Sequence, residues 1–293
     1  MDNQEFINFK KTRDLGSILS DTFKFISTEF KPFFVTIFKA SIIPVLIAIC
    51  AVIYYLMTST SFFGSLSLID DSDTFYDFNF SQIVIPLLIF IVSYVVAYAA
   101  VTVASLSYIK SYIENKGQVN YTEIQQSTKE KLLPYVGLFF LISIIIFFGI
   151  LFCFIPGIYL AVVLSLSICL LIFQDKGVFD AINDSFSFIK NHWWETFGIL
   201  LTIQILIGII SFLISLPASI YQGLDISSAL QNPNSTEILN SFSDPIYLLL
   251  IAFSHIIEFI LYIISTVAIV FVYYDIKEQK NPSSHIIDEI GRD

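Results

Sequence analysis

The sequence predicts an all-α protein, a polytopic membrane bundle of six transmembrane helices arranged as three hairpins. Of the 293 residues, 56% are hydrophobic and 14% are charged, and the mean hydropathy is +0.78, far from the average soluble domain. The apolar residues form six long stretches, most of them of at least the roughly 20 residues that a helix needs to cross a bilayer core. The 15 Lys and Arg residues lie on one side of these stretches, as they do when basic loops stay in the cytoplasm.

The six apolar stretches are the predicted spans, and their approximate limits are 33–57, 82–109, 132–155, 157–173, 193–217 and 246–274. The chain therefore divides into a cytoplasmic N-terminal segment, 1–32, a membrane domain, 33–274, and a cytoplasmic tail, 275–293. The connections at 58–81 and 218–245 contain no Lys or Arg. Because basic residues mark the cytoplasmic side, both termini are expected in the cytoplasm and the protein in an inner membrane.

An amphipathic interfacial helix is predicted before each of spans 1, 3 and 5. Before span 1, the apolar stripe at helical spacing consists of Leu15, Ile18, Leu19, Thr22, Phe23, Ile26 and Phe30. Before span 5, it consists of Val178, Ile182, Phe186 and Ile189. The segment 120–131 before span 3 has a thinner stripe, and Asn120 with Glu123 suggests a capping box. The recurring order favours an internal duplication of the first and third hairpin units; the alternative is that each segment became amphipathic independently beside a bilayer.

The third and fourth stretches are joined by Pro156-Gly157 alone, which predicts a tight turn at these two residues. The fourth stretch covers about 25 Å as a helix, slightly less than a core of about 30 Å. We expect two full crossings. A re-entrant hairpin satisfies the charge pattern equally well, because both of its ends return to the cytoplasm.

Small residues recur at steps of three and four on two spans, at Ser93, Ala97, Ala100, Ala104, Ser107, Ala161 and Ser165. Lipid supplies little hydrophobic drive between helices, so these stripes predict close helix packing. Trp193 and Trp194 stand at the inner start of the fifth span and are predicted to anchor it at the membrane interface.

His255 and Glu258 lie three residues apart near the middle of the sixth span, with Ser254 and Tyr262 nearby. An acid at this depth is costly, so it usually faces the bundle and has a partner. One interpretation is a candidate intramembrane polar site for proton transfer, for a substrate or for half of a metal site. The other is structural: a neutral Glu258 bound to His255, or to a tyrosine or serine on another span.

Several function classes find no support in the sequence. The net charge of −10 and the lack of a basic patch exclude a nucleic-acid partner. Cys50, Cys153 and Cys169 lie in apolar stretches without paired spacing, so neither a disulfide framework nor a metal site is implied. No catalytic motif and no phosphate-binding loop is present. We therefore predict no enzyme, no catalytic residue, no metal and no cofactor.

Three blocks of sequence carry a family resemblance: IPGIYL at 155–160, DKGVFDA at 175–181 and NHWWETFG at 191–198. This pattern resembles a large family of six-span bacterial membrane proteins, which includes the membrane domain of some glycerophosphodiester phosphodiesterases and many stand-alone members without assigned function. The resemblance implies a six-span protein of the bacterial inner membrane. It does not imply phosphodiesterase activity, because this chain lacks the phosphodiesterase barrel.

Three functions remain open at this point. The favoured one is a non-catalytic accessory or scaffold component of a membrane complex, with the lipid bilayer and another membrane protein as partners. The second is a transporter or lipid-handling protein with a polar site near His255 and Glu258. The third is an intramembrane enzyme built on that pair. A partner that co-purifies in fixed ratio would favour the first, and a polar cavity at mid-depth the second.

Overall fold

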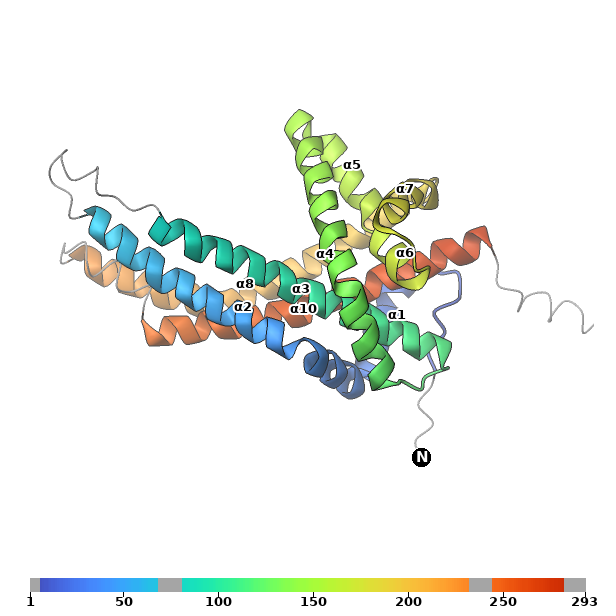
Figure 1. The fold of residues 1–293 in the computed structure, drawn as a ribbon, viewed down its shortest axis with the longest axis horizontal. Helices are drawn as coiled ribbons and strands as arrows, with labels where there is room; N and C mark the ends of the chain where they lie inside the picture. Colours follow the sequence, from blue (N-terminus) through green and yellow to red (C-terminus); the bar gives the residue numbers. More distant parts are fainter. Residues whose placement is uncertain (1–5, 68–80, 232–243, 282–293) are drawn as a thin grey trace, which may run out of the picture. The chain divides into compact units, whose positions relative to one another are not determined.

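The structure, a computed structural model, describes residues 6–67, 81–231 and 244–281. Within these ranges the chain is helical and contains no strand (Figure 1). Six helical segments are long and apolar enough to cross a membrane. The all-α polytopic fold predicted from the sequence is confirmed, and the protein is an integral membrane protein.

The helices in chain order are α1 (Leu15–Thr28), α2 (Phe30–Ser67), α3 (Ser81–Glu114), α4 (Tyr121–Phe152), α5 (Phe154–Leu164), α6 (Ser167–Phe173), α7 (Val178–Ile189), α8 (Trp193–Gln231) and α10 (Pro245–Lys280). The long helices extend beyond the predicted spans at their ends. The fourth candidate span consists of two short helices, α5 and α6, separated by a turn at Ser165 and Leu166.

The chain forms two compact units. Unit 1 comprises the described residues of 1–41, 99–206 and 262–293, and unit 2 those of 42–98 and 207–261. Helices α1 and α4 to α7 belong to unit 1, whereas α2, α3, α8 and α10 contribute residues to both units.

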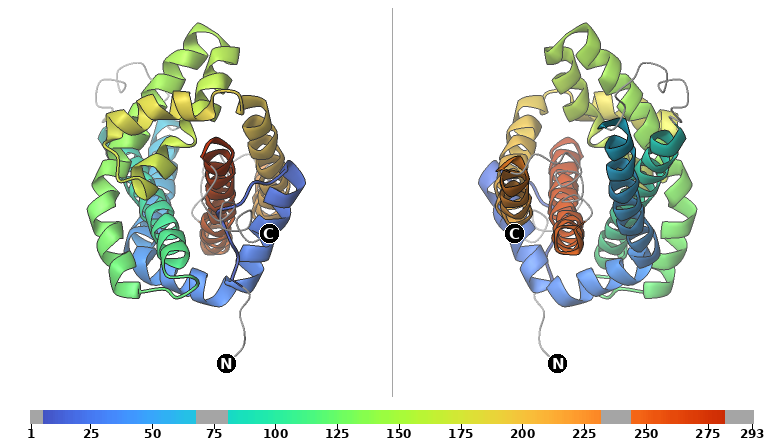
Figure 2. Two further views of the ribbon diagram at one scale, coloured as in Figure 1. Left: turned by 90° about the vertical axis from the view of Figure 1, so that its right-hand side faces the viewer. Right: turned by 90° about the vertical axis from the view of Figure 1, so that its left-hand side faces the viewer.

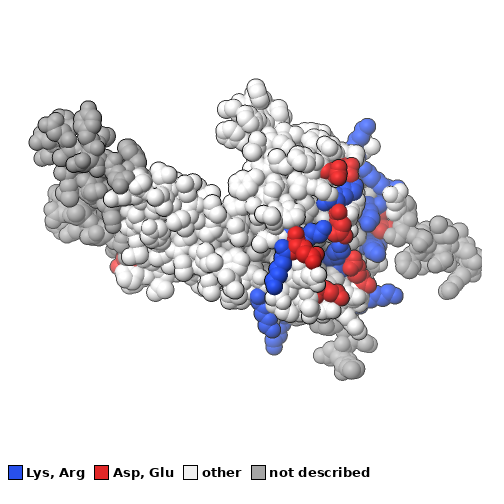
Figure 3. Space-filling view, in the orientation of Figure 1, with Lys and Arg blue, Asp and Glu red and all other residues white. Residues whose placement is uncertain are grey.

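Charge is distributed unequally between the two units. The sequence of unit 2 contains no Lys or Arg, so every described basic residue belongs to unit 1. Most acidic side chains of the described residues gather on the same unit (Figure 3). Among residues with described side chains, the acids of unit 2 are Asp244 and Glu258. The basic loops that were used to predict orientation thus collect in one unit.

Arg13 fixes the N-terminal segment within unit 1. Its side chain is 2% exposed, and its Nε donates to Asp21 Oδ2 at 2.7 Å. Its Nη1 donates to the Phe9 carbonyl at 2.9 Å, and the guanidinium lies 4.8 Å from the centre of the Phe271 ring. The backbone N–H of Arg13 donates to Asp275 at 2.7 Å. Because these charge-assisted bonds are shielded from water, they hold the segment firmly against α1 and the C-terminal part of α10.

Helix α1 buries only part of its predicted stripe. Asp14 caps the helix by accepting from the Ser17 N–H at 3.1 Å. Ile18 and Ile26 of this stripe are buried within the protein, but Phe23 is 46% exposed. Phe25, which lies outside the predicted stripe, is fully buried instead.

The junction between α1 and α2 contains a buried acid. Glu29 ends α1 and is 4% exposed. The Tyr108 hydroxyl of α3 donates to its Oε2 at 3.0 Å, and its carbonyl accepts from the Phe33 N–H at 2.9 Å. The bond from Tyr108 satisfies a carboxyl group that burial would otherwise make costly.

The other two amphipathic segments differ from each other. The segment before span 3 continues into the span without a break as α4, and Asn120 caps it by accepting from the Thr122 N–H at 3.1 Å. Helix α7 is separate and contacts α4, α5 and α6 (Figure 2). It buries Ile182 and Ile189 but leaves Phe186 40% exposed.

Helices α4 and α5 lie side by side as an antiparallel hairpin (Figures 1 and 2). The turn predicted at Pro156-Gly157 is wrong by a few residues, because the chain reverses at Cys153. Cys153 adopts an extended conformation that ends α4 and precedes α5. Pro156 and Gly157 lie in the first turn of α5, where proline is tolerated because the N–H groups have no partner within the helix.

Two glycines allow the hairpin helices to touch. A Cβ atom on Gly157 would lie 2.9 Å from the backbone nitrogen of Ile150, and one on Gly149 would lie 3.1 Å from the Cα of Gly157. Larger residues would push the helices apart at both positions. The glycines therefore explain the close backbone approach on which a hairpin in lipid depends.

Asp175, in the connection between α6 and α7, binds lysines of α3 and α4 within unit 1. It accepts from Lys131 at 2.8 Å and from Lys110 at 2.9 Å. Hydrogen bonds from Lys131 and Lys110 lower the pKa of Asp175 below its ordinary value of 3.8. Its backbone has a positive φ of 52°, a conformation that Asp and Asn tolerate better than most residues.

Candidate functional site

A cluster of three polar side chains, Tyr94, His255 and Glu258, lies in unit 2 between α3 and α10. His255 Nδ1 and Glu258 Oε2 are 2.9 Å apart. The Tyr94 hydroxyl lies 3.0 Å from the same nitrogen and donates to the same carboxylate oxygen at 3.3 Å. Phe259 packs against Tyr94 with ring centres 5.6 Å apart. We call these three polar residues the polar cluster.

The polar cluster is not enclosed by the chain. The side chains of His255 and Glu258 are 24% and 38% exposed. All of their described hydrogen bonds use Nδ1 and Oε2, so within the described residues nothing pairs with Nε2 of His255 or Oε1 of Glu258. An apolar helix thus presents one carboxyl oxygen and one ring nitrogen at its surface, a costly arrangement in hydrocarbon unless something polar covers them.

Unit 2 offers Glu258 no basic partner other than His255. The sequence of unit 2 has neither Lys nor Arg. The other acid of this unit with a described side chain, Asp244, lies at the N-terminal end of α10. It accepts from the Tyr221 hydroxyl at 3.1 Å and from the Ile246 N–H at 2.8 Å. A further cation for the Glu258 carboxylate would therefore have to come from outside this unit.

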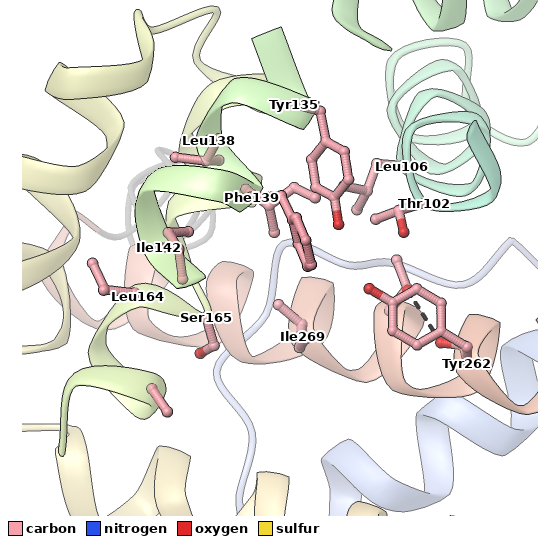
Figure 4. Close-up of a pocket in the computed structure, with 13 residues that line it drawn as sticks. Thr102, Leu106, Tyr135, Leu138, Phe139, Ile142, Leu164, Ser165, Tyr262 and Ile269 are labelled. Atoms are coloured by element: carbon pink, nitrogen blue, oxygen red, sulfur yellow. Dashed lines mark hydrogen bonds between the residues drawn. The ribbon is translucent and has the colours of Figure 1, made fainter. Parts of the chain in front are cut away.

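Ser254 and Tyr262, the two neighbours of the predicted pair, are used differently. The Ser254 hydroxyl donates to the Leu250 carbonyl of its own helix at 3.0 Å. Tyr262 belongs to unit 1, where it lines a cavity of about 180 Å³ formed by α3, α4, α5, α6 and α10. In Figure 4 the hydroxyl groups of Tyr262 and Tyr135 point toward each other there, and the Tyr135 hydroxyl also lies near that of Thr102.

The two predicted stripes of small residues have different surroundings. On α3, Ala97, Ala100, Ala104 and Ser107 are buried, and Ser93 is half-buried. The Ser107 hydroxyl lies 2.9 Å from that of Ser127 on α4. Ala161 is exposed and Ser165 half-buried, and both line the cavity of unit 1 rather than a helix contact.

The predicted interface anchors are also placed differently from each other. Trp193 stacks on Tyr159 with ring centres 5.7 Å apart, and its Nε1 donates to the Tyr159 carbonyl at 3.3 Å. Trp194 is 77% exposed. Trp193 therefore ties the start of α8 to α5, and Trp194 is available to a surrounding interface.

Tyr94 and Tyr135 were not identified from the sequence. Each is a tyrosine within a predicted span, and a buried tyrosine hydroxyl usually has a hydrogen-bond partner. That signal could have marked both residues as polar positions. It could not have assigned their partners, because Tyr94 and Glu258 are separated by 164 residues.

Comparisons with protein-family models, with curated proteins and with solved structures found no match to this chain. The resemblance to six-span bacterial membrane proteins therefore remains a prediction.

Proposed function

We propose that the protein is a non-catalytic component of a membrane complex, and that the polar cluster binds a transmembrane helix of its partner. One observation carries this proposal: Oε1 of Glu258 and Nε2 of His255 are presented at the surface of an apolar helix. Polar groups on a helix inside a bilayer normally pair with other polar groups. A partner helix would cover them and supply the missing hydrogen bonds.

The chemistry of the cluster defines the partner helix. A carboxyl oxygen accepts hydrogen bonds, and unit 2 provides no Lys or Arg. The complementary side chain is therefore a lysine or arginine in the partner's apolar span. Such a pair neutralises both charges within the bilayer, which makes the contact specific as well as stable.

Co-purification tests the proposal. The protein is purified from its native membrane in mild detergent, and partners are identified and quantified by mass spectrometry. We expect one membrane protein to co-purify at a fixed ratio to this chain. The amount of this partner should fall greatly with Glu258→Leu. It should fall only partly with Glu258→Gln, which keeps an acceptor oxygen. Leu213→Ala on α8, a truncation at a 57% exposed position outside the cluster, is the matched control and should retain the partner.

Thermal unfolding of each variant separates docking from folding. Glu258→Leu removes the partner of His255 and Tyr94, so we expect a cost of about 1–3 kcal/mol without loss of the fold. If Glu258→Leu keeps the partner at the parental ratio, or if no partner is found at a fixed ratio, the docking proposal is wrong.

A second candidate function is proton-coupled transport. It is favoured by the joining of three titratable side chains in one hydrogen-bonded cluster within candidate spans. Glu258→Gln distinguishes the two functions because it cannot exchange a proton. In vesicles containing a pH-sensitive dye, a transporter would dissipate a pH gradient, and both Gln and Leu variants would abolish this. If the cluster is only a docking site, neither the parent protein nor either variant should dissipate the pH gradient.

A further inference from the structure

The cavity of unit 1 is chemically suited to a hydrocarbon chain. None of the residues that line it is charged, and most are apolar, including Leu106, Leu138 and Ile142. Apolar cavities of about 150 Å³ remain dry and accept a molecule of the size of benzene. A cavity of about 180 Å³ therefore accommodates a chain segment of about six carbon atoms.

The exposed part of the cavity wall belongs to candidate spans. Phe139 on α4 is 38% exposed, and Ala161 on α5 is also exposed. Both helices contribute to candidate membrane spans. A molecule that enters between Phe139 and Ala161 would therefore come from the bilayer and not from water.

The cavity also has a polar region. Tyr135, Tyr262 and Thr102 place their hydroxyl groups together there (Figure 4). The three hydroxyl groups are uncharged hydrogen-bonding groups in an otherwise mostly apolar lining. They can donate to an ester carbonyl, whereas a carboxylate or phosphate would find no cation among the lining residues.

We propose that this cavity binds the ester end of one acyl chain of a bilayer lipid. The first carbons of the chain fill the apolar part, and the ester carbonyl accepts a hydrogen bond from the hydroxyl cluster of Tyr135, Tyr262 and Thr102, in which Tyr135 also bonds to the other two. The site lies in unit 1 and does not depend on the polar cluster or on a protein partner.

Photolabelling in reconstituted vesicles tests this site. The full chain is placed in vesicles of phosphatidylcholine and phosphatidylglycerol that contain a trace of photoreactive phosphatidylcholine. One probe carries its diazirine next to the ester group and a second carries it near the methyl end of the chain. We expect the first probe to label residues 135–142 and 161–168 about fivefold more than the second. One hydrogen bond to the ester group would favour this orientation of the chain by about that factor.

Two substitutions provide the matched comparison. Ala161→Phe fills the cavity and should reduce labelling of 135–142 to the level of other exposed residues. Gly208→Phe adds the same ring to an exposed position of α8, where an added Cβ meets nothing within 4 Å, and should leave labelling unchanged. The proposal is wrong if Ala161→Phe is labelled at residues 135–142 as strongly as the parent. It is also wrong if the ester-end probe labels all exposed spans of the parent to the same extent.

A second variant keeps the test decisive if Ala161→Phe does not fold. Tyr135→Phe combined with Tyr262→Phe removes two hydroxyl groups and preserves both rings. Labelling by the ester-end probe should fall about fivefold, while labelling by the methyl-end probe stays the same. If the double variant labels as the parent does with both probes, the tyrosine hydroxyl groups do not bind the ester group and the proposal is wrong.

Discussion

At the scale of single residues, Asp175 makes the stability of unit 1 depend on pH. Its folded-state pKa is lowered by Lys131 and Lys110, so its contribution is fully present above the unfolded pKa of about 3.9. The contribution is lost as the pH falls through the lower folded-state value. The Asp175 side chain is 58% exposed, so solvent screening limits its contribution to about 1 kcal/mol.

Asp175→Asn should therefore destabilise the protein near neutral pH, and the deficit should shrink as the solution is acidified below a pH of about 4. Asparagine tolerates the positive φ at this position, so the backbone is not a confounding factor. Thermal unfolding in detergent across this pH range measures the effect. A deficit for Asp175→Asn that is independent of pH would contradict a role for the ion pairs.

Single residues also show how far the sequence could identify the candidate site. His255 and Glu258 could be selected because ionisable residues are rare in apolar spans. Their spacing along one helix turn also predicted that they could meet. Tyr94 could not be assigned, because many tyrosines occur in this sequence and contacts between spans depend on helix rotation, which hydropathy does not determine.

At the scale of secondary-structure elements, the α4–α5 hairpin depends on the absence of side chains where its helices touch. Gly157→Ala would place a Cβ 2.9 Å from the Ile150 nitrogen and force the helices apart. We expect a loss of about 1–3 kcal/mol in the free energy of unfolding, as for other overpacked contacts. The shift of the unfolding midpoint in mild detergent measures it.

The hairpin contains its own control. A Cβ on Gly137 of α4 meets nothing within 4 Å, so Gly137→Ala should be neutral or stabilising by up to about 1 kcal/mol, since alanine favours helix. If both alanine variants behave alike, the close approach at Gly157 does not contribute to stability.

Helix α1 shows why helical periodicity predicted an element but not its packing. The spacing of the apolar residues correctly predicted a helix, now found at Leu15–Thr28, but it did not predict that Ile18 and Ile26 are buried against the rest of the chain. Phe25 was missed because the surface that covers it includes the N-terminal segment, whose Phe9 lies 5.2 Å from it between ring centres. Nothing in the period of α1 indicates that a second segment packs on another of its faces.

At the scale of the whole molecule, the distribution of Lys and Arg predicts the orientation in the membrane. Single cysteines replacing Asp71 and Asn234, both outside the described residues, should react with an impermeant thiol reagent on intact cells. A cysteine replacing Lys129 should react only after permeabilisation. The native Cys50 and Cys153 are exposed, so they must be replaced first, together with Cys169. Labelling of Lys129→Cys in intact cells would reverse the predicted orientation.

The six-helix layout could be predicted from the sequence because span length and apolar composition are properties of single segments. The division into two units could not. The boundary between the units falls inside α2, α3, α8 and α10, and each of these helices is apolar enough to be a candidate span, so hydropathy does not mark the boundary. The concentration of Lys and Arg was visible in the sequence, but its placement on a single compact unit was not.

The N-terminal segment also ties the completion of unit 1 to the synthesis of α10. The Arg13 N–H and its acceptor Asp275 are 262 residues apart, an interval that a ribosome crosses in roughly 15–50 s at about 5–20 residues per second. Throughout that time Phe9, fully buried in the finished protein, has no Phe271 to stack on. A chain that stops before Phe271 leaves uncovered the face of the Phe9 ring on which Phe271 stacks, although Phe25 already packs against its edge. This uncovered face gives proteases and chaperones a means to distinguish a chain without the end of α10 from one that has it.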